Sequence, residues 1–143
     1  MENHISASDI LEQEKSTEKA TQTIREKILN GVFPEEVRNQ IAGFYKSLGE
    51  NVRVAVRSSA TAEDLEDASF AGQQETYLNV IGEEMLFTKI KECYASLWAN
   101  RAVDYRKKQG YDKQKVALAV VIQLMITSQS KAGKGTYERK YFI

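Results

Sequence analysis

The sequence predicts a mixed α/β fold, and three periodic patterns along the chain carry this prediction. Apolar residues recur every three or four positions in two stretches of the first 50 residues. Valines alternate with other residues over 52–57, which is typical of a strand. A helical stripe over 83–108 precedes a run over 116–126 that is apolar on both faces except at Gln123. The expected order is therefore N-terminal helices followed by strand, loop, strand, helix and strand.

Two amphipathic helices are expected in the N-terminal region. The first has a stop signal at Asn30-Gly31, and the second has Pro34 at a first helical position and Gly49 at its end. The apolar positions at helical spacing are Ile24, Ile28 and Leu29 in the first helix and Val37, Ile41, Phe44, Tyr45 and Leu48 in the second. Such stripes predict helices that pack against another layer.

The first strand is expected to end near Arg57, and a second strand covers 76–81 and is closed by Gly82. Between them, residues 58–72 are rich in Ser, Ala, Asp and Glu and have no sustained period. This composition predicts a long loop, and loops of that length in compact domains are usually functional or disordered.

One long helix is expected over 83–108, because acidic residues at its start and basic residues at its end suit the helix dipole. Cys93, Tyr94 and Trp98 lie on its apolar stripe, so we expect them in the core rather than in a site. Residues 127–143 contain glycines and charges without a convincing period, which predicts a poorly structured end.

The composition argues against several classes of protein. The 20 basic residues balance the 20 acidic ones, so no overall field attracts nucleic acid or an anionic membrane. With one Cys and one His in the chain, a zinc site is not expected. The N-terminus is polar and acidic, unlike a signal peptide, and the apolar run over 116–125 is too short to span a bilayer. We therefore expect a cytoplasmic protein.

The segment after the first predicted strand has the features of a phosphate site. Arg57 ends the strand, and a guanidinium offers donors in a fixed fork that suits phosphate oxygens. The small residues that follow allow backbone N–H groups to approach an anion. From this pattern alone an ion pair of Arg57 with Glu63 or Asp64 remains the alternative, since no Walker motif is present.

The same residues resemble the ATP-binding domain shared by phosphoenolpyruvate synthases, pyruvate phosphate dikinases and rifampicin phosphotransferases. The resemblance is carried by Arg-Ser-Ser-Ala at 57–60, Glu63-Asp64, Ala-Ser-Phe-Ala-Gly at 68–72, Thr76, the segment 96–110 and the strand over 116–125. It covers roughly residues 52–126 well and the N-terminal helices weakly.

The resemblance implies an ATP-grasp-like fold and an ATP-dependent phosphotransferase that acts through a phosphohistidine on a separate domain. It assigns Arg57 to the ATP phosphates and to catalysis, Gly72 and Thr76 to the loop that covers the phosphates, and Gln123 to the adenine side of the nucleotide. Gly72 is alternatively a simple turn residue. Gln123 is alternatively on an edge strand facing water, since a lone amide in an apolar strand needs a partner. No metal ligand is assigned in this chain, because the resemblance places the Mg²⁺ ligands further along the family sequence.

The chain also departs from the pattern of that family. We find no counterpart of its glycine-rich loop with an ATP-binding lysine, and the likeness stops abruptly at 127–143. Relatives usually have proline where Glu66 stands. The phosphohistidine and acceptor-binding domains are also missing, so the resemblance implies a chain that lacks the parts needed for activity alone.

We accordingly expect a helical region over 1–50, a partial ATP-grasp-like domain over 51–126 and a divergent tail over 127–143. The leading hypothesis is a truncated or split nucleotide-binding domain that works when a complementary chain supplies the rest. The alternatives are a non-catalytic interaction module and a non-functional gene remnant of the same family.

Overall fold

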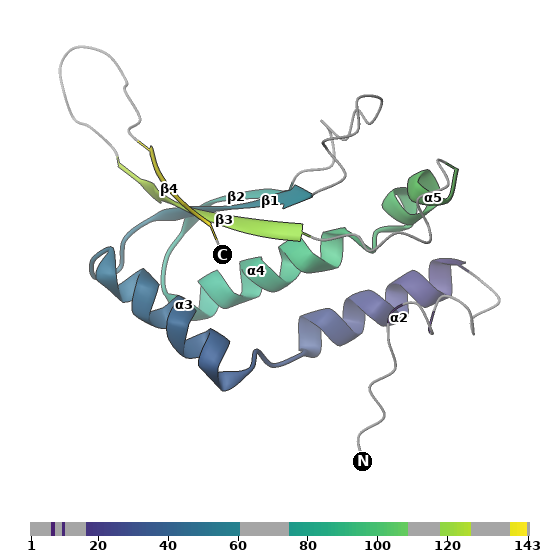
Figure 1. The fold of residues 1–143 in the computed structure, drawn as a ribbon, viewed down its shortest axis with the longest axis horizontal. Helices are drawn as coiled ribbons and strands as arrows, with labels where there is room; N and C mark the ends of the chain where they lie inside the picture. Colours follow the sequence, from purple (N-terminus) through teal and green to yellow (C-terminus); the bar gives the residue numbers. More distant parts are fainter. Residues whose placement is uncertain are drawn as a thin grey trace, which may run out of the picture.

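The computed structural model describes Ala7, Ile10 and residues 17–60, 75–108, 118–126 and 138–142 of the chain (Figure 1). In these residues the elements follow the order α2, α3, β1, β2, α4, α5, β3 and β4, and the strands form one antiparallel sheet. This arrangement confirms the mixed α/β class. Within the described ranges, no helix is long and apolar enough to cross a membrane.

The two N-terminal helices form where the apolar spacing predicts them. Helix α2 spans Thr17–Asn30 and ends at the predicted stop signal. Helix α3 spans Glu35–Ser47, so Pro34 is its N-cap rather than its first helical residue. Pro34 has an extended ψ of 139°, and its carbonyl accepts the N–H of Arg38 at 2.9 Å, which starts the helical hydrogen bonds. Gly49 follows α3 with a φ of 129°, a conformation that favours glycine.

The prediction of one long helix over 83–108 was wrong, because the chain breaks at 97–99 into α4 (Glu83–Ser96) and α5 (Asn100–Lys108). Contacts with other parts of the chain stabilise the break. The guanidinium of Arg106 donates from Nη2 to the carbonyl of Leu97 at 2.7 Å, which satisfies an acceptor at the end of α4. The hydroxyl of Thr21 on α2 hydrogen-bonds the side chain of Asn100 at the start of α5. An apolar stripe does not reveal such contacts.

The sheet contains β1 (Val54–Ala60), β2 (Thr76–Val80), β3 (Leu118–Met125) and β4 (Glu138–Phe142) in the order β2-β1-β3-β4. Strands β1 and β3 pair antiparallel from Val54 opposite Leu124 to Ala60 opposite Leu118. The first strand therefore continues past Arg57, and the predicted start of the loop at residue 58 was wrong. Pairing with β3 keeps 58–60 extended despite their small, polar composition.

Strand β4 lies in the segment for which the composition predicted no regular structure, and for 138–142 that prediction was wrong. These residues pair antiparallel with β3 from Val121 opposite Phe142 to Met125 opposite Glu138. The pairing covers a row of β3 backbone groups that would otherwise form an open sheet edge. Residues 127–137 lie outside the described residues, and the division into three regions stays a prediction.

Helices α3 and α4 pack against one face of the sheet, and α2 lies beyond α4 on the same side (Figure 1). The main core lies between these layers and consists of Ile41, Tyr45, Val54, Val56, Val80, Leu86, Phe87, Ile90, Cys93, Val120 and Ile122. Cys93 is buried there, as predicted, and desolvation together with the nearby Glu75 and Glu92 raises its pKa to about 12. Tyr94 and Trp98 are half-buried and pack at the margins of the apolar clusters.

The side chain of Tyr45 joins two connecting segments around this core. Its hydroxyl donates to the carbonyl of Val52, just before β1, at 2.8 Å. The same oxygen accepts the N–H of Gly82, the N-cap of α4, at 2.8 Å. Tyr45 is 4% exposed, so the hydroxyl holds two backbone groups that water does not replace freely.

We predict that Tyr45→Phe lowers the free energy of unfolding by about 1–3 kcal/mol, because it leaves the Val52 carbonyl and the Gly82 N–H without this partner. Urea unfolding followed by circular dichroism measures the change. Tyr94→Phe is the matched control and should leave stability almost unchanged, since within the described residues the Tyr94 hydroxyl has no hydrogen bond. Equal effects of the two substitutions would contradict this role of Tyr45.

Candidate functional site

The alternation along β1 separates the core from a second, polar face of the sheet. Val54 and Val56 are fully buried in the helix-facing core. Because successive strand residues point to opposite faces, Ala55 and Arg57 lie on the other face. In the described part of the chain no helix lies over that face (Figure 1).

Arg57 and Gln123 meet on the face away from the helices. Gln123 on β3 lies opposite Ala55, and Arg57 lies opposite Val121, so the two side chains are diagonal neighbours. The Nη1 atom of Arg57 donates to Oε1 of Gln123 at 3.3 Å. The structure therefore brings together two predicted site residues that are 66 positions apart in sequence.

The surroundings of Gln123 exclude one of its two predicted environments. Strand β3 lies between β1 and β4, and the residue is only 2% exposed. The alternative of an edge-strand amide facing water was therefore wrong. Arg57 is one of the hydrogen-bond partners of Gln123. An apolar residue at position 123 would not supply the acceptor that the Arg57 guanidinium needs.

Thr76 is the third predicted site residue in the described structure. It begins β2 directly opposite Arg57 and is exposed. Directly opposite residues share a face of a sheet, so Thr76 lies on the face that also carries Arg57. Its hydroxyl can both donate and accept a hydrogen bond. Three adjacent strands thus place an amide, a guanidinium and a hydroxyl side by side.

Ser58 is a residue of this region to which our sequence reasoning gave no role. It is 3% exposed and lies next to Arg57, on the helix-facing side of β1. Its Oγ accepts the N–H of Glu75 at 2.9 Å, and its N–H donates to the carbonyl of Glu75 at 3.0 Å. Ser58 thereby fixes the position at which the chain returns to the sheet before Thr76. The sequence did contain a signal for this role, since Ser58 occupies a core-facing position of an alternating strand. A buried hydroxyl at such a position needs a hydrogen-bond partner.

The remaining residues of the predicted site lie outside the described residues. They are Gly72, and also Glu63 and Asp64, the alternative partners of Arg57. Among the residues that the structure describes, no group of three or more His, Cys, Asp or Glu could hold a metal ion.

Comparison with known proteins places the chain in a family. Residues 2–135 match the family described as pyruvate phosphate dikinase, AMP/ATP-binding domain. The chain belongs to this family. The match includes both N-terminal helices, so the likeness extends further towards the N-terminus than residues 52–126.

Individual members of the pyruvate phosphate dikinase family show the same relationship. The chain is 48% identical over 130 residues to a phosphoenolpyruvate synthase of Pyrococcus furiosus and 49% identical over 123 residues to one of Aquifex aeolicus. It is 47% identical over 124 residues to a rifampicin phosphotransferase of Bacillus cereus. These alignments cover 82–87% of this chain but only 14–16% of the relatives. The chain therefore spans a small part of the proteins it matches.

We predict that Ser58→Ala lowers the free energy of unfolding by about 1–3 kcal/mol, because it removes the buried acceptor of the Glu75 N–H. Chemical denaturation measures the loss, and hydrogen exchange at Glu75 should accelerate. Ser59→Ala is the matched control on the same strand, where the neighbouring serine is less buried and points to the other face. Unchanged protection at Glu75 in Ser58→Ala would show that the serine does not fix this point of return.

Proposed function

We propose that the sheet face carrying Arg57, Thr76 and Gln123 forms one wall of an ATP site, with Arg57 directed at the phosphates. The observation that carries the proposal is the placement of Arg57 between an exposed hydroxyl and a buried amide. A guanidinium held by a neutral acceptor keeps its full charge, which phosphate oxygens can share through its remaining N–H groups. The family description, which names AMP and ATP, agrees with this assignment.

The role of Gln123 follows from its contact with Arg57. Its amide oxygen accepts from the guanidinium, and the side chain is almost fully buried. We therefore assign Gln123 to orienting Arg57, in addition to the adenine-side contact that the resemblance implies. A pre-oriented arginine loses less conformational freedom when phosphate binds, which favours binding.

One wall of a nucleotide site supports weak binding. Phosphoryl transfer depends on positioning and on charge neutralisation from several sides, including metal ions. We propose that this chain acts in ATP-dependent phosphoryl transfer, as a phosphoenolpyruvate synthase-like protein, only when other protein parts complete the site. A complementary chain would pack beside the sheet face that carries Arg57, supply the Mg²⁺ ligands and carry the phosphorylated histidine. The proposal places this assembly in the cytoplasm, where ATP is at hand.

An exposed apolar side chain on the face that carries Arg57 supports such a completing partner. Leu78 on β2 is 60% exposed. Alternation along β2 places Leu78 on the same face as Thr76. Exposed apolar groups next to a polar site are typical of surfaces that another protein covers. The same observation favours the second candidate, a non-catalytic interaction module that uses this face to bind a protein.

Nitrogen-15 NMR titration with Mg-ATP tests the proposed function, because it detects weak binding. We expect shifts for residues on the sheet face that carries Arg57. Arg57→Ala should weaken the apparent affinity about tenfold or more, the effect of losing a charge-assisted contact. Arg25→Ala on α2 removes an exposed arginine from the helix side and should leave the titration unchanged. Shifts confined to the helix side, or no shifts at millimolar nucleotide, would favour the interaction module or a remnant.

A double-mutant cycle separates the two roles of Gln123. If Gln123 acts through Arg57, Gln123→Met weakens ATP binding less than Arg57→Ala, and the double variant binds no worse than Arg57→Ala alone. If Gln123 contacts the nucleotide independently, the two effects add. The same NMR titration measures all four proteins. Additive effects would contradict the orienting role while leaving the ATP site itself in place.

A further inference from the structure

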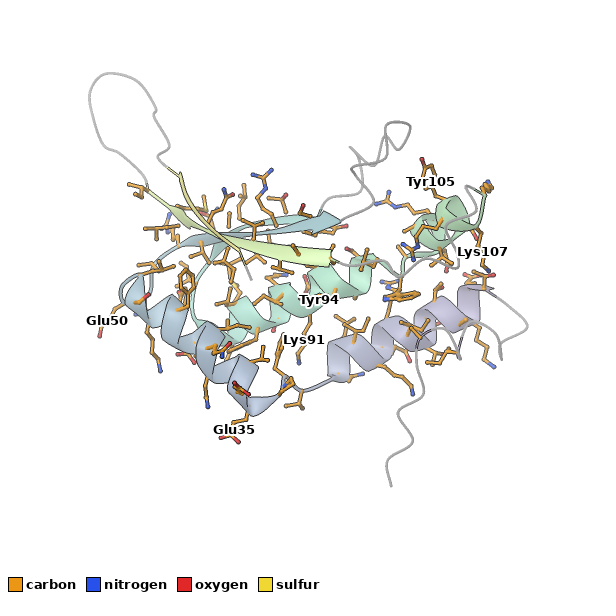
Figure 2. The ribbon with its side chains drawn as sticks, viewed as in Figure 1. Glu35, Glu50, Lys91, Tyr94, Tyr105 and Lys107 are labelled. Atoms are coloured by element: carbon orange, nitrogen blue, oxygen red, sulfur yellow. The ribbon has the colours of Figure 1, made fainter. Side chains whose placement is uncertain are left out.

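The connection between α2 and α3 begins with an asparagine followed by a glycine. Asn30 is the last residue of α2, and it is exposed. The connection lies at the periphery of the molecule, where Glu35 at the start of α3 projects outward (Figure 2). Within the described residues, the side-chain amide of Asn30 makes no hydrogen bond. The amide of Asn30 is therefore accessible and is not held in one orientation by a partner in the described structure.

Packing explains why a glycine follows Asn30. A Cβ at position 31 would lie 3.0 Å from the carbonyl oxygen of Lys27 and 3.3 Å from that of Ile28, so a larger residue would have to shift the connection. The N–H of Gly31 donates to the Ile28 carbonyl at 3.2 Å, which is at the long end of the normal range. The backbone nitrogen of Gly31 is thus hindered neither by a side chain nor by a short hydrogen bond.

The other asparagines in the described part of the chain lack this combination, because each is followed by a residue with a side chain. The pairs are Asn39-Gln40, Asn51-Val52, Asn79-Val80 and Asn100-Arg101. A side chain at the following position obstructs the approach of its backbone nitrogen to the asparagine amide, and a β-branched one is the bulkiest near the backbone. The side chain of Asn100 is also hydrogen-bonded to Thr21.

We propose that Asn30 is a site of spontaneous deamidation in the folded protein. The backbone nitrogen of Gly31 loses its proton to hydroxide and forms a bond with the side-chain amide carbon of Asn30. The carbon–nitrogen bond of that amide breaks, and the nitrogen takes a proton from water and leaves as ammonia. The resulting five-membered imide then takes up one water molecule. Opening at one carbonyl gives aspartate, and opening at the other gives isoaspartate, in which the main chain runs through the former side chain.

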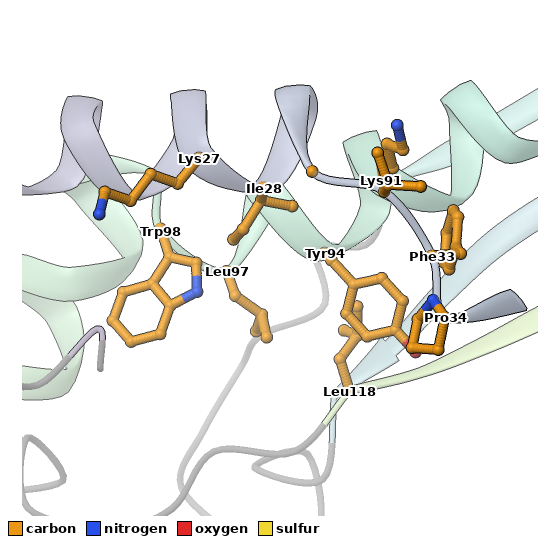
Figure 3. A pocket seen from close by; sticks show the side chains of 11 residues that line it. Lys27, Ile28, Phe33, Pro34, Lys91, Tyr94, Leu97, Trp98 and Leu118 are labelled. Atoms are coloured by element: carbon orange, nitrogen blue, oxygen red, sulfur yellow. The ribbon is translucent and has the colours of Figure 1, made fainter. Parts of the chain in front are cut away.

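Isoaspartate at this position would alter the packing of the connection. It lengthens the main chain by one methylene group directly before the close approach of Gly31 to the Lys27 carbonyl. Further along the connection, the Phe33 ring packs on the Phe87 ring of α4, with ring centres 5.4 Å apart. The Lys91 ammonium of α4 lies 5.9 Å from the centre of the Phe33 ring (Figure 3). These contacts join the connection to α4, so the isoaspartyl form should be less stable than the original chain.

Ageing of the full chain tests the proposal. The protein is kept at neutral pH, digested at acidic pH, which stops the reaction, and analysed by mass spectrometry, which detects the exchange of an amide for a carboxyl group. We expect modification at Asn30, while Asn39 and Asn100 in the same sample stay unmodified. Equal rates at the three asparagines would overturn the proposal. Modification of Asn30 only in guanidinium chloride would overturn it as well, because the fold would then protect the site.

Two variants separate the chemistry from its structural consequence. Asn30→Gln keeps an amide whose longer side chain does not form the five-membered imide, so it should stay unmodified over the same period. Asn30→Asp carries the new charge without the extra methylene group in the main chain. We expect the isoaspartyl fraction of the aged protein to melt about 2–4 °C below both variants, the shift that a modest loss of packing produces in a chain of this size. Equal melting of that fraction and Asn30→Asp would overturn the altered packing of the connection.

Discussion

The antiparallel pairing of β1 with β3 is the constraint on which the other features of this molecule depend. The register runs from Val54 opposite Leu124 to Ala60 opposite Leu118, and both strands lie inside the sheet. It directs Val56 and Ile122 into the core and places Arg57 and Gln123 together on the opposite face. A slip of one residue would exchange the two faces of a strand. The same pairing therefore determines the core and the geometry of the candidate site.

Buried polar groups on the helix-facing side of the sheet fix the positions of the segments that connect to β1. Tyr45 ties the approach to β1 to the start of α4, and Ser58 ties β1 to the residue before β2. Both side chains are buried, and both hydrogen-bond backbone groups of connecting segments. Apolar packing alone is non-directional and would not define where these connections meet the sheet. The position of Thr76 beside Arg57 consequently depends on hydrogen bonds made on the opposite side of the sheet.

The sequence predicted those parts of this architecture that depend on local periodicity. The two N-terminal helices, β2, and the two-sided apolar character of β3 follow from spacing along the chain. The break at 97–99 involves a hydrogen bond between Asn100 and Thr21 of α2, and strand β4 depends on pairing with β3; periodicity does not record such contacts between segments. Arg57 and Gln123 were each identified, but their contact joins β1 and β3 across a long stretch of sequence. The role of Ser58 was not predicted, because the prediction required knowing which face of β1 packs against the helices.

The electrostatic state of Arg57 connects this fold to nucleotide chemistry. In the described structure its side-chain partner is an amide oxygen, and no described carboxylate forms an ion pair with it. A carboxylate at position 123 would hold the guanidinium as firmly but would cancel its charge and repel a phosphate. An apolar residue there would leave the guanidinium without a fixed orientation. Glutamine orients the cation without neutralising it, and this is the combination that an arginine needs in order to bind an anion that arrives from solution.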